Sequence, residues 1–425
     1  MNAREAAFRA LQQVELENSF ADLAIPPNLS PQLHNDARTI VFAVLRWRSR
    51  LDALISQLSG RRVQKIDQPL LQILRMAFVE VLFLSTPAHA AVNEAVTMAG
   101  RLFPRGKGFV NAVLRKISGG DLDSLEKGST ASPATRAGHP DWLVERWIAR
   151  FGVERALSIA AANQELSRPD VLVNITRTTT EEMEASLTER RVSAQRSELV
   201  SNMLRLRSSS DEVRLDVEGG LLYPMDEGSA AVATLIPAEC RSVLDLAAAP
   251  GGKSLHLMMR GHDVTSHDIS LRRMQPLRES ALRMFGRRPR LVIADGTRPP
   301  FRRRHDAVLI DVPCSATGTI RRNPEIKWRL QPAQLGVFQT LQIALLEAAL
   351  ELTDRFCLYS TCSLEREENE DVIEKVLRRN DSFEQIDLAE VAEGELSRWI
   401  EGGSLRLTPE SGADGFTAFG LRRRK

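Results

Sequence analysis

Short apolar segments alternate with helical segments after residue 225, and this alternation is the feature that most restricts the fold. The predicted strands lie at 242–246, 263–267, 290–294, 307–310 and 355–360, and the predicted helices include 253–259 and 332–352. Strands that alternate with helices form parallel sheets whose faces the helices cover. The pattern therefore predicts a doubly wound α/β domain of the Rossmann-like kind over 226–425.

The first part of the chain has the period of helices instead. Apolar residues recur at helical spacing in five segments, which cover 5–16, 37–58, 69–84, 87–103 and 108–117. We expect an all-α domain over 1–127. The small residues and prolines after it are typical of a boundary and predict a linker over 128–140.

Between these parts, residues 141–225 mix both periods and predict a small α+β subdomain. A helix is expected to begin near 141 and another to cover 180–190. Residues 171–175 have the pattern of a strand, and 203–206 and 213–215 are strand-like. The whole chain is therefore expected to be a multidomain protein, with an all-α front, an α/β domain and a small α+β insert.

The sequence predicts no membrane or secretion segment and no disulfide or metal site. No apolar run of about 18 residues predicts a membrane helix, and the charged start of the chain does not resemble a secretion signal. The four cysteines are too few for a disulfide scaffold, and neither they nor the histidines have the spacing of metal ligands. We expect a cytoplasmic protein that uses no metal and contacts no membrane.

Arginine dominates the basic residues. Of the 57 basic residues, 49 are arginine and 8 are lysine, against 55 acidic residues. The arginines crowd within 272–290, 302–304 and 321–329. A GC-rich genome would also favour arginine, but these local runs favour a polyanion partner, since the guanidinium group grips phosphate and stacks on bases.

A glycine-containing loop follows the first predicted strand of the α/β domain. It reads Asp245-Leu246-Ala247-Ala248-Ala249-Pro250-Gly251-Gly252-Lys253. Such a loop, before a helix N-terminus, binds phosphates or a nucleoside cofactor. A phosphate-binding loop of NTPases needs glycine where Ala247 stands. Asp268 and Asp295 end the next two strands, and an acid about 20 residues after the loop favours the nucleoside reading.

Two cysteines follow two further strands. Two segments each come at the end of a predicted strand, at the same edge of the sheet: Asp311-Val312-Pro313-Cys314-Ser315 and Ser360-Thr361-Cys362-Ser363. Cys240 and Cys357 fit the ordinary role of a small buried hydrophobic residue. Cys314 and Cys362 do not, because both come after strands and beside hydroxyl residues. In the NTPase reading, Asp311 would be the magnesium-binding acid.

These motifs, in this order, resemble the RsmB (Sun/Fmu) family of rRNA cytosine-C5 methyltransferases over nearly the whole chain. Further matching segments are Arg321–Glu325, Glu367–Glu370 and Asp414–Phe416. The helical front resembles NusB, through 91–95 and 108–115. Ala316 stands where the family commonly has glycine, which predicts a stiffer loop after Cys314.

The resemblance implies an enzyme that methylates small-subunit (16S) ribosomal RNA with S-adenosylmethionine. We expect the protein to be a monomer. The resemblance also implies that Cys362 attacks C6 of the cytosine, that Cys314 assists release and that Asp311 binds the cytosine edge. It implies a cofactor site made of Ala247, Ala248, Ala249, Pro250, Gly251, Gly252, Lys253, Asp268, Asp295 and Asp311. Two alternatives stay open: an NTPase that acts on RNA, and a NusB-like RNA-binding regulator without catalysis.

Overall fold

The computed structural model describes residues 1–17, 19–117, 122–127, 129–207 and 211–424. The chain forms two compact units, the first from Met1–Glu165 with Ile320–Leu330 and the second from Leu166–Thr319 with Gln331–Lys425. The predicted domain limits remain predictions, and the first linker residue, Gly128, lies outside the described residues. In the described ranges no helix is both long and apolar enough to cross a membrane. The cytoplasmic location also remains a prediction.

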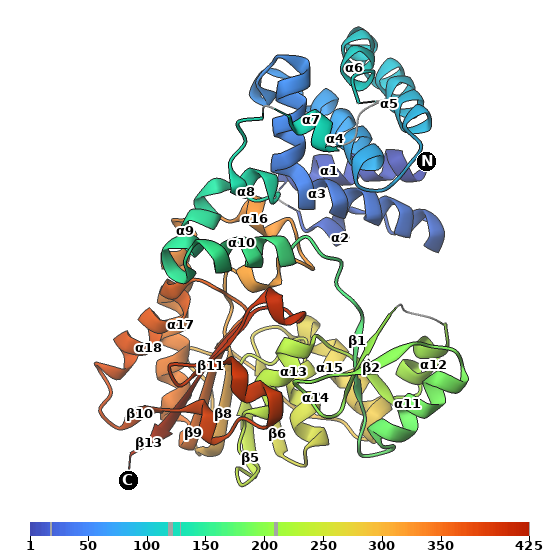
Figure 1. Ribbon diagram of the computed structural model, residues 1–425. Coiled ribbons are helices and arrows are strands. Elements are labelled where there is room, and N and C mark those ends of the chain that lie inside the picture. Colours follow the sequence, from blue (N-terminus) through green and yellow to red (C-terminus); the bar gives the residue numbers. More distant parts are fainter. Residues whose placement is uncertain (18, 118–121, 128, 208–210, 425) are drawn as a thin grey trace. The chain divides into compact units, whose positions relative to one another are not determined.

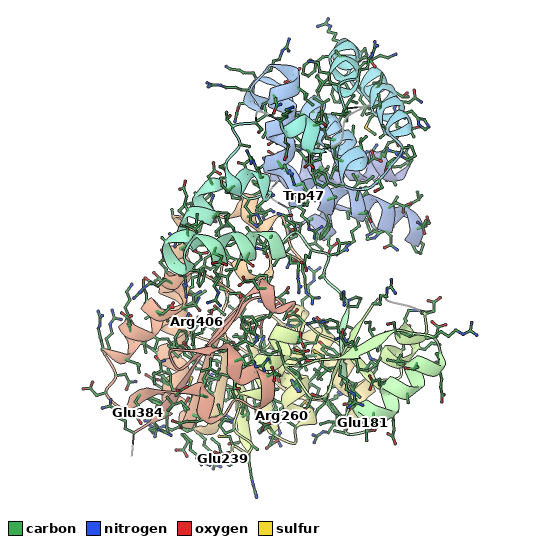
Figure 2. All side chains as sticks on the ribbon, viewed as in Figure 1. Trp47, Glu181, Glu239, Arg260, Glu384 and Arg406 are labelled. Atoms are coloured by element: carbon green, nitrogen blue, oxygen red, sulfur yellow. The ribbon has the colours of Figure 1, made fainter. Side chains whose placement is uncertain are left out.

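The first unit is helical, as the sequence predicts (Figure 1). Its helices are α1 (Ala3–Glu17), α2 (Ala21–Ala24), α3 (Pro31–Ser59), α4 (Gln68–Leu82), α5 (Ala88–Leu102), α6 (Lys107–Leu114), α7 (Leu122–Glu126), α8 (Pro133–Arg136), α9 (Asp141–Phe151) and α10 (Val153–Ala162), with the 3-10 turns η1 (Val63–Lys65) and η2 (Pro104–Gly106). Helix α3 begins at the N-cap Ser30 and ends where Gly60 takes a left-handed conformation. Trp47 of α3, labelled in Figure 2, stacks on Phe83 with ring centres 4.4 Å apart.

An eleven-residue segment from late in the sequence, Ile320–Leu330, belongs to this helical unit. Its short helix α16 (Ile326–Arg329) lies beside the helices of the unit in Figure 1. The indole of Trp328 donates to the Leu45 carbonyl at 2.6 Å, and Lys327 Nζ donates to the Arg46 carbonyl at 2.8 Å. The chain therefore enters the helical unit directly after the Cys314 loop, a path that the local sequence pattern does not predict.

The second unit contains a four-stranded antiparallel sheet in the order β2-β3-β1-β4. Its strands are β1 (Asp170–Val173), β2 (Ala194–Arg196), β3 (Met203–Leu206) and β4 (Leu222–Pro224), with helices α11 (Thr180–Glu189) and α12 (Asp211–Glu218). The predicted strand at 213–215 is wrong, because these residues belong to α12. Val213 and Val217 are four residues apart and pack on one apolar cluster, as a helical face does.

The larger sheet of this unit has nine strands, in the order β11-β12-β13-β9-β8-β5-β6-β7, with β10 paired to β13. The strands are β5 (Ser242–Asp245), β6 (Asp263–Asp268), β7 (Arg290–Ile293), β8 (His305–Asp311), β9 (Thr353–Thr361), β10 (Phe383–Ile386), β11 (Ile400–Glu401), β12 (Ser404–Leu407) and β13 (Phe416–Arg423). The five predicted strands, β5 to β9, are confirmed and pair in parallel. The predicted parallel arrangement holds for these five strands, and β13, which the sequence did not predict, continues the sheet antiparallel to β9.

Helices cover both faces of this sheet. Ala307 and Leu309 of β8 pack in one apolar cluster, and Val308 and Ile310 pack in another. The first face carries α13 (Glu227–Thr234), α14 (Gly252–Met259) and α15 (Leu271–Phe285), and the second carries α17 (Gln334–Glu351) and α18 (Glu370–Leu377), as Figure 1 shows. Because β5, β6 and β8 are parallel, their final residues meet at one edge of the sheet.

Candidate active site at the carboxyl edge of the sheet

The loop after β5 turns sharply into α14. Gly251 has φ +111°, and a Cβ there would lie 2.4 Å from the Leu277 side chain, so only glycine fits this turn. The loop is anchored below by Asp245, which accepts a 2.7 Å hydrogen bond from the Ser254 hydroxyl. Complete burial raises the pKa of Asp245 to about 7.

Two carboxylates at the ends of neighbouring strands border the loop. Asp268 ends β6 and accepts the backbone N–H groups of Ala249 and Ser270 at 3.2 and 2.9 Å. Asp295 follows β7, is exposed and accepts the N–H and hydroxyl groups of Thr297. These bonds, the backbone one above all, lower the pKa of Asp295. Asp268 therefore links the loop after β5 to the end of β6.

Asp311, at the end of β8, makes an ion pair with Lys253 of α14. The Lys253 ammonium lies 2.7 Å from Asp311 Oδ2, and Asp311 Oδ1 accepts from the Ser360 hydroxyl at 2.8 Å. Lys253 also donates to the Ser229 hydroxyl at 2.8 Å and lies 4.9 Å from the centre of the Phe416 ring. The lysine is 8% exposed, so this contact is a mostly buried charge pair.

The sulfur atoms of Cys314 and Cys362 are 3.4 Å apart. The pKa of the Cys314 thiol is raised well above its usual value. The largest cause is the hydrogen bond with Cys362, followed by burial and by the negative charges of Cys362, Glu368 and Asp311. Ala316, two residues after Cys314, has φ +59°, a left-handed conformation that glycine adopts without strain. Cys240 and Cys357 lie apart from this pair in the interior, as predicted, and burial raises their pKa values to about 11 and about 12.

Two cavities collect most of the predicted site residues. One, of about 290 Å³, is lined by both of these thiols and by Ala247, Ala249, Asp268, Asp295 and Asp311, among others. The other, of about 210 Å³, is lined by Ala247 to Pro250, Gly252, Lys253 and Asp311, among others. Gly251 lines neither cavity, and its part is the turn against Leu277.

The cavities have unused polar atoms that a nucleoside cofactor would satisfy. Asp245 Oδ1 and His267 Nε2 are buried without a hydrogen-bond partner among the described residues, and these two residues line one cavity each. Asp268 and Asp295 add carboxylates that suit hydroxyl and amino donors. In the parts of the chain that are described, no cluster of three His, Cys, Asp or Glu residues could hold a metal ion.

Some participating residues were not predicted as site residues. Ser360 belongs to the motif that contains Cys362, and Glu368 belongs to the matching segment Glu367–Glu370. Neither motif indicated the contacts that these two residues make. Ser229 and Tyr223 line the smaller cavity and belong to a stretch that no motif marked.

Comparison with known families places each part of the chain. Residues 232–422 match the family described as 16S rRNA methyltransferase RsmB/F. Residues 1–119 match the NusB family, and residues 139–211 match the ferredoxin-like domain of RsmF/B-like methyltransferases. The predicted combination of a NusB-like front, an α+β insert and a Rossmann-like domain is confirmed.

Individual relatives match along the full chain. The ribosomal RNA small subunit methyltransferase B of Pseudomonas putida is 31% identical over 98% of this chain and 97% of its own. A probable ribosomal RNA small subunit methyltransferase B of Bacillus subtilis is 27% identical over 100% and 99%. The crystal structure of PH0851 superposes with a TM-score of 0.77 at 25% identity, covering 99% of this chain and 98% of that one. The chain therefore belongs to the RsmB/F family of 16S rRNA methyltransferases.

Proposed function

We propose that this enzyme transfers a methyl group to C5 of a cytosine in small-subunit (16S) ribosomal RNA, through a covalent bond between Cys362 and C6 of the base. S-adenosylmethionine is the cofactor and supplies an electrophilic methyl group. The observation that carries the proposal is that two thiols 3.4 Å apart share one cavity with Asp311 and with the loop after β5. The names of the relatives support the RNA substrate.

The chemistry needs a nucleophile because C5 of cytosine attacks a methyl group poorly. When the Cys362 thiolate adds to C6, the electrons of the C5–C6 double bond become available at C5, which then takes the methyl group. Asp311 would bind the N3 and N4 edge of the base and share a proton with it. Lys253, held between Asp311 and Ser229, would keep that carboxylate oriented.

Release requires a base for the C5 proton, and we assign this role to Cys314. The largest cause of its raised pKa is the hydrogen bond with Cys362. Once the Cys362 sulfur is bonded to carbon, this cause disappears, so Cys314 loses its own proton to solvent water more readily, and the resulting thiolate accepts the C5 proton. The electrons of the C5–H bond then restore the C5–C6 double bond and expel the Cys362 thiolate.

The test is transfer of labelled methyl groups from S-adenosylmethionine to unmodified 16S rRNA, followed by mapping of 5-methylcytosine by bisulfite sequencing. The target base must leave its stack to reach the cavity, at a cost of about a few kcal/mol. Hydrolysis of ATP without methyl transfer would favour the NTPase alternative. RNA binding without transfer would favour the regulator.

The variant Asp268→Ala tests the cofactor site. Losing a hydrogen bond to a charged group costs about 1.5–3 kcal/mol, so we expect the affinity for S-adenosylmethionine to fall about 10- to 150-fold. Calorimetry measures this affinity, and RNA binding should not change. Asp263→Ala, at the opposite end of the same strand and on the surface, is the matched control. An unchanged affinity in Asp268→Ala would contradict the assignment.

The arginine run 302–304 tests the RNA surface. All three side chains are exposed. Each lost phosphate contact lowers the slope of log affinity against log salt by about 0.7–0.9, so replacing Arg302, Arg303 and Arg304 by glutamine should flatten this slope. Arg378 and Arg379 are exposed arginines already paired with glutamates, and their replacement by glutamine is the control. An equal slope in both variants would mean that Arg302, Arg303 and Arg304 do not contact RNA phosphates. A GC-rich genome, which favours arginine codons, would then be the better explanation of this run.

A further inference from the structure

Glu368 is a buried carboxylate that uses both oxygens beside the two thiols. It ends the 3-10 turn η4 (Arg366–Glu368), and its exposure is 0%. Oε1 accepts from the Ser315 backbone N–H at 2.8 Å and from Gln342 at 3.0 Å. Oε2 accepts from the hydroxyls of Ser315 and Ser363. The Tyr359 hydroxyl donates to the Glu368 carbonyl at 2.6 Å and so fixes the backbone that carries this carboxylate.

The two serines are the residues that directly follow the two cysteines. Ser315 comes after Cys314, in the loop that leaves β8, and Ser363 comes after Cys362, in the loop that leaves β9. Their hydroxyls lie 3.0 Å from each other. A single carboxylate oxygen therefore ties together two loops that are 48 residues apart in the sequence.

Glu368 also adds a negative charge to this corner of the site. Its hydrogen-bond partners are neutral: a backbone N–H, two hydroxyls and an amide. Burial raises the pKa of Glu368, and the hydrogen bonds from Ser315 and Ser363 oppose this change. The Glu368 charge is one of the causes that raise the pKa of Cys314, after the Cys362 hydrogen bond and burial.

We propose that Glu368 is a positioning residue for the methyl transfer, whose carboxylate holds the loops of Cys314 and Cys362 together. The negative charge of Glu368 also disfavours the Cys314 thiolate in the resting enzyme. The proposal rests on the proposed function, because only a reaction that uses both thiols on one base needs them at a fixed separation. A protonated Cys314 can donate to the Cys362 thiolate, and this thiolate is then directed at C6.

The geometric part is tested with phenylarsine oxide, which bonds two neighbouring thiols and releases water. Intact-protein mass spectrometry should show one arsenical bound in the wild type and none in Cys362→Ala. In Glu368→Ala and in Ser315→Ala/Ser363→Ala the concentration needed for half-occupancy should rise at least about tenfold. The control is Glu374→Gln, an exposed glutamate on α18. Equal arsenical binding in the wild type, in Glu368→Ala and in Ser315→Ala/Ser363→Ala would overturn the proposal.

The electrostatic part is tested with Glu368→Gln, which keeps the size of the side chain but removes the charge. In a Cys362→Ser background, iodoacetamide should modify Cys314 faster at pH 8 when residue 368 is glutamine. The increase is about tenfold for each unit by which the pKa of Cys314 falls, because the thiolate is the reacting form. Peptide mass spectrometry measures the rate at Cys314 alone. An unchanged rate would overturn this part.

Activity then separates positioning from folding. Glu368→Gln should lower kcat on 16S rRNA at least about tenfold, leave the KM for S-adenosylmethionine within about twofold and shift the pH–rate profile to lower pH. A scaled-down rate with the wild-type pH profile would mean a merely structural role. Neither the arsenical assay nor the iodoacetamide assay uses RNA. Both therefore still test the role of Glu368 if the wild type fails to methylate rRNA. If Glu368→Gln does not fold, Ser363→Ala in the arsenical assay decides instead.

Discussion

Cys362→Ala is expected to abolish methyl transfer, whereas Cys314→Ala is expected to transfer the methyl group and then remain bonded to the RNA. Without the Cys362 thiolate, no adduct at C6 activates C5, and serine or alanine cannot replace a thiolate near neutral pH. Without Cys314, the C5 proton of the methylated adduct stays in place, so the electrons that would expel Cys362 are not released.

The measurement is a protein–RNA band that survives denaturing electrophoresis. It should form with Cys314→Ala in the presence of S-adenosylmethionine and be absent with Cys362→Ala and with the double variant. Cys240→Ala is the matched control, since Cys240 is a buried cysteine that lines neither cavity of the site. A stable band from Cys362→Ala alone would reverse the roles of the two thiols. Two active variants without any band would exclude both as the nucleophile.

The parts of the fold with a clear hydrophobic period were predictable. The helix predicted at 37–58 lies within α3, and the strand predicted at 307–310 lies within β8, because each repeats apolar residues over its full length. Residues 213–215 are too few to separate the two periods. The strands β10 to β13 were missed, and their place in the sheet depends on pairing with one another and with β9 rather than on alternation with helices.

The segment 320–330 shows what local patterns omit. It lies between a predicted strand and a predicted helix of the α/β domain, yet Trp328 and Lys327 donate to carbonyls of α3. Nothing in the neighbouring residues indicates partners some 280 positions away, because such contacts depend on the packed structure. Burial lowers the pKa of Lys327 well below its usual value, a consequence of that packing.

For the site, the sequence located strand ends but not the contacts between them. Asp268, Asp311, Cys314 and Cys362 were predictable because parallel strands bring their carboxyl ends to one edge. The bond of Glu368 to both serines, and the pairing of Lys253 with Asp311, depend on side-chain geometry that spacing does not determine. Ala316 illustrates the reverse case: the resemblance marks a position where glycine is common, and the left-handed backbone there explains why.

The Lys253–Asp311 pair should be the most sensitive charge pair of the site. Removing one partner of a buried ion pair leaves the other charge uncompensated, which costs about 3–5 kcal/mol, whereas removing both is often nearly neutral. Exposure of the Asp311 side chain, 26%, places the expected cost at the lower end, about 3 kcal/mol. Lys253→Met and Asp311→Asn should therefore each lose about this much unfolding free energy in urea, and the double variant should recover most of it.

Methyl transfer should fall at least about 100-fold in all three, because Asp311 is needed at the cytosine edge and Lys253 orients it. The exposed pair Asp263 and Arg290 is the control, and its removal should change little. Additive losses of stability in the double variant would mean that the two charges do not depend on each other, and the orienting role of Lys253 would then fail.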